Sequence, residues 1–149
     1  MTTPSPARQL DTFLARFSPE IVALAKAARA KFRKRFPRAV EMVYDNFNAL
    51  VIGYSPTERP SDAVFSIVIY PACVNLYFIR GAHLPDPEGV LKGAGNQGRH
   101  IRLDAGAAIL DTPAIRAVMS EAIAFGETPF RGKGRLVIRA IMKKQRPRR

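Results

Sequence analysis

The chain has 149 residues, of which 47% are hydrophobic, and this length and composition suit one domain with a single core. The single cysteine, Cys73, excludes an intramolecular disulfide, and no apolar run is long enough for a membrane-spanning helix. The formal net charge of +12 favours polyanionic partners. We therefore expect one domain over residues 1–142 and a basic tail over residues 143–149, in the cytoplasm and without a membrane partner.

The positive charge is concentrated in two blocks that contain no acidic residue. Seven of the 24 Lys and Arg residues lie between Lys26 and Arg38, and nine lie from Arg131 to the end. The residues expected to form a basic surface are Lys26, Arg29, Arg33, Lys143, Lys144, Arg146, Arg148 and Arg149. Such a surface suits nucleic acid or a phosphorylated small molecule, whereas a compositional bias towards Arg would leave it merely solvated. Because no aromatic residue outside the apolar helix face alternates with these charges, we expect any nucleic-acid binding to be non-specific.

Two helices are expected at the N-terminus. Ser5-Pro6 and Ser18-Pro19 each combine an N-cap residue with a proline at the first helical position. Apolar residues then recur at helical spacing, and Pro37 ends the second helix. The Phe-rich face of this helical pair requires a sheet to cover it.

Strands dominate the middle of the chain. Residues 39–45 alternate in polarity, and residues 49–54 return as a second strand after a turn. The alternation gives one face with Val40, Met42 and Tyr44, and another with Glu41, Val43 and Asp45. Residues 64–70 and 74–79 are rich in β-branched and aromatic residues and are separated by Pro71, which predicts an antiparallel hairpin at the centre of the sheet.

Residues 81–100 form an irregular stretch that is long enough to be functional or disordered. A short strand over residues 100–104, a helix from Thr112-Pro113 to Gly126, and a strand over residues 136–142 follow. The sequence thus predicts an α+β fold, in which an antiparallel sheet of about five to six strands packs against the N-terminal helical pair and a C-terminal helix.

The middle of the chain resembles a known family. The segments VYDNFNALVIGYSPTERPSDAVFSIVIYP and GAHLPDPEGVLKGAGNQGRHIRL, the helix that Thr-Pro initiates and the basic end KQRPRR are similar to the YdhG-like family, labelled domain of unknown function 1801. The resemblance covers residues 39–124 most closely and implies a small α+β domain that is distantly similar to frataxins. One family member is connected with iron delivery through an acidic helix surface. Here the N-terminal helices hold only Asp11 and Glu20 as acids, so we do not expect that role.

A glycine-rich basic loop is the first candidate site. Its glycines allow a backbone to approach an anion closely, and the guanidinium of Arg99 can bind a phosphate or carboxylate. The candidate anion-binding residues are Lys92, Gly93, Gly95, Asn96, Gly98, Arg99, His100 and Arg102. The loop lacks the Gly-Lys-Ser/Thr ending and the following helix of a P-loop, and glycine required for loop geometry alone is the alternative.

A polar turn is the second candidate site, as a small-molecule pocket. Its residues are Tyr44, Asp45, Asn46, Asn48 and Tyr54, although such residues also serve as turn formers with their rings in the core. Cys73, His83 and His100 have no metal-ligand spacing, so we expect no metal, cofactor or catalytic set.

Three functional hypotheses follow from the sequence. The first is a non-enzymatic binding module for an anionic ligand or nucleic acid, which relies on the two basic blocks. The second is an enzyme of unknown class with a pocket between the polar turn and the Gly81–His100 loop. The third is a protein–protein interaction domain that uses an exposed sheet edge.

Overall fold

The computed structural model describes residues 3–46 and 48–141, and these residues form the expected α+β fold. The helices are α1 (Pro6–Leu14), α2 (Pro19–Arg35) and α3 (Pro113–Phe125). The strands are β1 (Val40–Asp45), β2 (Leu50–Ser55), β3 (Phe65–Ile69), β4 (Val74–Phe78), β5 (Arg99–Arg102) and β6 (Arg135–Ala140). Short 3₁₀ turns are η1 (Pro60–Asp62), η2 (Gly81–His83) and η3 (Ala107–Asp111).

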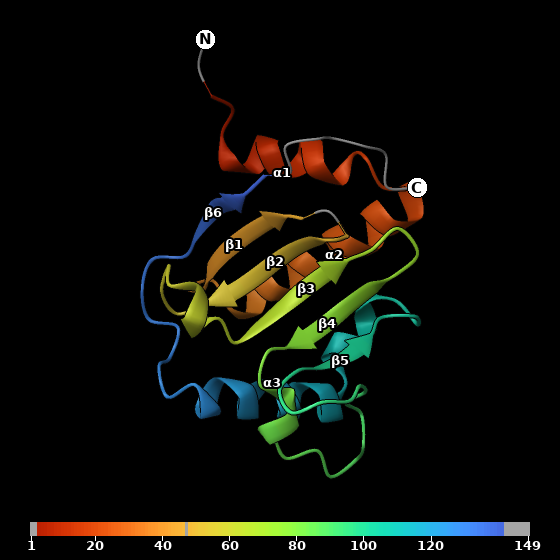
Figure 1. Ribbon diagram of the computed structural model, residues 1–149, viewed down its shortest axis with the longest axis vertical. Helices are drawn as coiled ribbons and strands as arrows, with labels where there is room; N and C mark the ends of the chain where they lie inside the picture. Colours follow the sequence, from red (N-terminus) through yellow and green to blue (C-terminus); the bar gives the residue numbers. More distant parts are fainter. Residues whose placement is uncertain (1–2, 47, 142–149) are drawn as a thin grey trace.

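The strands form one sheet in the order β5-β4-β3-β2-β1-β6 (Figure 1). The predicted hairpin is confirmed, since β3 and β4 pair antiparallel from Phe65 opposite Phe78 to Ile69 opposite Val74. The centre of the sheet is the β2–β3 pair, one strand away from the centre that the sequence predicted. Apart from the β1–β6 pair, all neighbouring strands pair antiparallel.

The edge strand β6 is the exception to the expected antiparallel sheet, because it runs parallel to β1. After β5, the chain turns into α3, which runs along the ends of the strands towards the opposite edge of the sheet (Figure 1). The chain therefore enters β6 from the end at which β1 begins. A parallel pair requires such a crossover connection.

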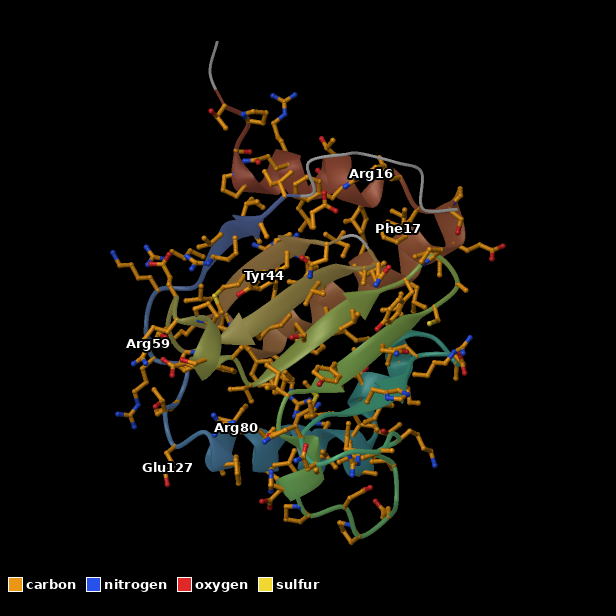
Figure 2. The ribbon with its side chains drawn as sticks, in the orientation of Figure 1. Arg16, Phe17, Tyr44, Arg59, Arg80 and Glu127 are labelled. Carbon is orange, nitrogen blue, oxygen red and sulfur yellow. The ribbon has the colours of Figure 1, made fainter. Side chains whose placement is uncertain are left out.

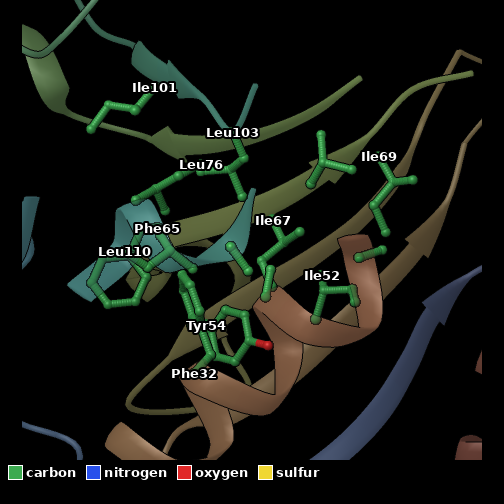
Figure 3. Close-up of a cluster of buried hydrophobic side chains, with 14 of the residues drawn as sticks. Phe32, Ile52, Tyr54, Phe65, Ile67, Ile69, Leu76, Ile101, Leu103 and Leu110 are labelled. Carbon is green, nitrogen blue, oxygen red and sulfur yellow. The ribbon is translucent and has the colours of Figure 1, made fainter. Parts of the chain in front are cut away.

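The helical pair covers one face of the sheet, and α2 lies behind the strands in Figure 1. Phe32 of α2 packs on Tyr54 of β2 and Phe65 of β3, with ring centroids 4.6 and 5.5 Å apart. Figure 3 shows this cluster continuing across the sheet through Ile67 and Leu76, both 0% exposed. The Phe-rich helix face therefore packs on the sheet that it requires, while no helix of the described residues lies over the opposite face.

The three predicted helix starts hold the expected N-cap residue and proline, but Ser18 and Thr112 make no side-chain cap hydrogen bond. The Ser5 hydroxyl accepts a hydrogen bond from the Arg8 amide, as an N-cap residue does. Gly126 ends α3 as expected but keeps right-handed backbone angles, and Glu127 takes the positive φ of 62°.

The start of β6 passes very close to the end of α2. A Cβ atom at Gly134 would collide with the carbonyl oxygen of Pro37 and approach that of Ala39, both of them backbone atoms. A side chain at this position would push the start of β6 away from β1. Glycine is thus required here by space.

We expect Gly134→Ala to destabilise the fold by about 2 kcal/mol, because the backbone must shift to admit the methyl group. Gly132→Ala is the matched control, since nothing lies within 4 Å of a Cβ atom there, and it should be neutral or slightly stabilising. Urea unfolding of the two variants measures the difference. Equal midpoints would contradict the close approach of the two segments.

Candidate anion-binding site

Two carboxylates lie on the helix-covered face of β1. Glu41 and Asp45 are 6% and 1% exposed, and they flank the core residue Val43. Each forms an ion pair with an arginine from the helical pair: Arg29 of α2 with Glu41 at 2.9 Å, and Arg16, after α1, with Asp45 at 2.8 Å. Since a buried carboxylate is tolerated only when it is paired, these contacts fix the helices on β1.

Glu41 accepts hydrogen bonds from two side chains at once. Arg29 donates to both carboxylate oxygens at 2.9 and 3.0 Å, and the Tyr54 hydroxyl donates to Oε2 at 2.8 Å. Burial acts to lower the pKa of Arg29, but the hydrogen bonds and charge of Glu41 outweigh it and raise that pKa. Burial, together with the charge of Glu41, raises the pKa of Tyr54 well above its usual value. Tyr54 is therefore a neutral donor and Arg29 a permanent cation.

A pocket of about 580 Å³ opens beside this network, and we name it the cationic pocket. Its walls come from the start of α1, the second half of α2, and the starts of β1 and β6. Among the described residues, four cationic side chains line it, against one carboxylate, that of Glu41. The four are Arg29, Arg33, Lys34 and Arg135.

These four cations come from both basic blocks of the sequence. Three belong to the block between residues 26 and 38, whereas Arg135 belongs to the second block. They lie together because β6 pairs with β1 in parallel. This pairing places Arg135 opposite Val40, the first residue of β1, which follows α2 closely along the chain. The sequence predicts the two basic blocks, but it does not predict that their side chains line one pocket, since strand pairing between distant segments has no local signal.

The charges in the pocket differ in how far they are already balanced. Arg29 is used by Glu41, and Arg135 forms an ion pair with Glu58. Arg33 lies 4.0 Å from Glu41 and its side chain is 63% exposed. Within the described part of the chain, no carboxylate lies within ion-pair distance of Lys34. Arg33 and Lys34 are thus the cations most available to a ligand.

The remaining residues of the predicted basic surface lie elsewhere. Lys26 is exposed on α2 and does not line the cationic pocket. The predicted tail residues fall outside the described residues: Lys143, Lys144, Arg146, Arg148 and Arg149.

The glycine-rich loop is held together by its own hydrogen bonds. The Arg99 guanidinium donates to the carbonyl oxygens of Gly98 and Gly95 at 2.7 and 3.0 Å. Lys92 and His100 form a β-bridge, and Arg102 pairs with Asp104 at 2.6 Å. The two strongest anion-binding groups of the predicted site therefore already have partners within the protein. Anion binding at this loop, which also includes Gly93 and Asn96, stays a prediction.

The five residues of the predicted polar-turn pocket do not share one site, because neighbours along a strand point to opposite faces. Asp45 and Tyr54 lie on the helix-covered face, where they bind Arg16 and Glu41. Tyr44, Asn46 and Asn48 line a hollow of about 640 Å³ on the uncovered face, which we name the trough. No residue of the Gly81–His100 loop lines the trough.

Histidine and cysteine also take separate positions. His83 stacks on Phe125 with ring centroids 5.9 Å apart, and Cys73 is half-buried in the β3–β4 turn. Across residues 3–46 and 48–141, no three His, Cys, Asp or Glu side chains gather as metal ligands would. None of the helices in this part of the chain has the length and apolar character needed to cross a membrane.

Comparisons with protein-family models, curated proteins and solved structures found no match to this chain. Membership of the YdhG-like family therefore stays a prediction from the quoted motifs.

We expect Glu41→Ala to lower the free energy of unfolding by about 3 kcal/mol, because Arg29 and the Tyr54 hydroxyl lose their common partner. Glu121→Ala, at an exposed position of α3, is the control and should change stability by less than about 0.5 kcal/mol. Urea unfolding monitored by circular dichroism gives both values. A loss below about 1 kcal/mol at Glu41 would show that the network contributes little.

Stability should fall as the pH rises above about 10, with a contribution from Tyr54 of about 1.4 kcal/mol per pH unit. In this range the unfolded chain releases the phenolic proton, whereas burial retains it in the folded state, so alkali favours unfolding. Tyr54→Phe lacks this group and should lose stability less steeply over the same range. Parallel pH profiles of the two proteins would contradict the raised pKa.

Proposed function

We propose that this protein is a non-enzymatic binding module and that a phosphate-bearing small molecule is its ligand in the cationic pocket. One observation carries the proposal: the pocket joins side chains from both basic blocks around a single carboxylate, which Arg29 already neutralises. The volume of about 580 Å³ lies within the range of small-molecule sites.

The available cations suit a phosphate group. Arg33 and Lys34 are neighbours on the last turn of α2, and both line the pocket. Guanidinium and ammonium groups form charge-assisted hydrogen bonds with phosphate oxygens, which are stronger than those between neutral groups. The Glu41 network holds Arg29 in place at the base of this arrangement.

A nucleic-acid backbone is the second candidate ligand, because positive charge continues around the end of α2. Lys34 also lines a neighbouring hollow with Lys31, Arg35 and Arg116. Lys31 is already paired with Asp111 at 2.5 Å, so the charge of this second hollow is partly balanced. A polyanion that contacts both hollows would show the salt dependence of phosphate-backbone binding.

Removing the two available charges should weaken binding of inorganic pyrophosphate, the probe for the phosphate group. In isothermal titration calorimetry at low salt, we expect the Arg33→Gln/Lys34→Gln double variant to bind at least about tenfold more weakly than the wild type. Lys26→Gln removes a charge from an exposed position of the same helix outside the pocket, and it should bind within about twofold of the wild type.

The outcomes separate the two ligands. Equal pyrophosphate binding by wild type and double variant would place the anion elsewhere and refute the cationic pocket as its site. Labelled duplex DNA forms the second arm of the experiment. Salt-sensitive binding of duplex, lost in the double variant and without pyrophosphate binding, would favour the nucleic-acid candidate.

A further inference from the structure

We propose that the trough is a second binding site, which holds a neutral planar nitrogen heterocycle against the tyrosine rings that line it. The trough lies on the uncovered face of the sheet, whereas the cationic pocket lies beside the helical pair, so this inference goes beyond the proposed function. It depends on the shape of the trough, its lack of charge and its polar groups.

The shape of the trough follows from the strand register. One row of paired residues crosses the open face from Met42 through Gly53, Ser66 and Tyr77 to His100. Two small residues therefore stand in the middle of the row, where larger side chains would fill the hollow. Neighbouring strands lie about 4.8 Å apart, so β1 and β4 are roughly 14 Å apart at this level.

Aromatic rings stand on both sides of this floor. Tyr44, which lies over the uncovered face in Figure 2, leans towards the floor, since a Cβ atom at Gly53 would be 4.0 Å from its ring. Tyr77, 36% exposed, lies on the far side with the hydroxyl end of its ring over Gly98, and Tyr70, 37% exposed, lies at one end. Three of the four tyrosines of the chain thus line one hollow. Flat rings that stack on tyrosine are the ligands that such walls favour.

The trough carries no charged side chain among its described lining residues, in a protein of net charge +12. The lining therefore favours a neutral ligand, because no described cationic side chain lines the trough to bind an anion. Asn46 and Asn48 lie at the same end as Tyr70, whereas Pro60 and Ala63 bound the opposite end. Boundaries at both ends favour a small molecule over a polymer that passes through.

Hydrogen-bonding groups lie at the floor and edge of the trough. Ser66 lies on the floor, and Asn46 and Asn48 line one end. A nitrogen heterocycle carries both N–H donors and ring acceptors at its edge, so it can satisfy such groups while its face stacks on tyrosine.

The test uses adenosine, uridine and riboflavin as neutral planar probes, with binding measured by calorimetry and by ligand-observed NMR. Gly53→Leu should weaken binding at least about tenfold, because the new side chain fills the floor of the trough. Gly53→Ala is the matched control and should bind within about threefold, since a Cβ atom there makes only ordinary contacts with Ser66 and Tyr44. Urea unfolding of both variants checks that they fold.

A second pair of variants keeps the test sound if Gly53→Leu fails to fold. Tyr77→Leu should weaken binding of the probes at least about fivefold. Tyr77→Phe keeps the stacking ring and should bind the probes as the wild type does. Pyrophosphate binding by the Gly53 and Tyr77 variants should equal that of the wild type. A wrong proposal for the trough is thereby distinguishable from a wrong proposal for the cationic pocket.

Three outcomes would overturn the proposal. One is no binding of any of the three probes by the wild type. Another is equal binding by Gly53→Ala and a folded Gly53→Leu. The third is binding of a single-stranded oligonucleotide of about ten bases with no binding of the free probes, which would make the open face a nucleic-acid platform.

Discussion

The ion pairs of β1 with the helical pair are the constraint on which the rest of the structure depends. Glu41 and Asp45 occupy the face of the strand that packs under the helices, so each must meet an arginine or leave a charge buried. Arg29 and Arg16 meet them from α2 and from the end of α1. The two ion pairs join the helical pair to one strand at two points and, together with the packing of Phe32, define how the helices lie on the sheet.

The same constraint shapes the cationic pocket. Because Glu41 holds Arg29 against the sheet, the last turn of α2 lies beside the start of β1, and Arg33 and Lys34 border the space between them. β6 then closes that space when it pairs with β1. Among the described lining residues, Arg29 and Arg135 pair closely with Glu41 and Glu58, whereas Arg33 and Lys34 are exposed. On α2, Arg29, which pairs with Glu41, thus lies near Arg33 and Lys34, the cations available to a ligand.

The sequence predicted most of the elements, since their signals are local. A few neighbouring residues suffice to predict the helix starts at Ser5-Pro6 and Ser18-Pro19. The same is true of the hairpin at Pro71. The alternation along β1 grouped Glu41 with Val43 correctly, but it did not show that this face is buried, because the neutralising arginines come from distant positions. The residues of the polar turn were assigned to one pocket because they are close along the chain. Since side chains alternate along a strand, Tyr54 and Tyr44 point to opposite faces of the sheet. The hairpin register, which pairs Glu41 with Tyr54, is the signal that would have corrected this grouping.

The parallel pairing of β6 with β1 has a consequence for how the chain folds. β1 is synthesised before the segment that becomes its neighbour, because residues 46–134 separate the two strands along the chain. Contacts of this sequence separation slow folding, because the intervening loop must close before they form. The cationic pocket, whose walls include the starts of β1 and β6, therefore depends on this long-range strand pair.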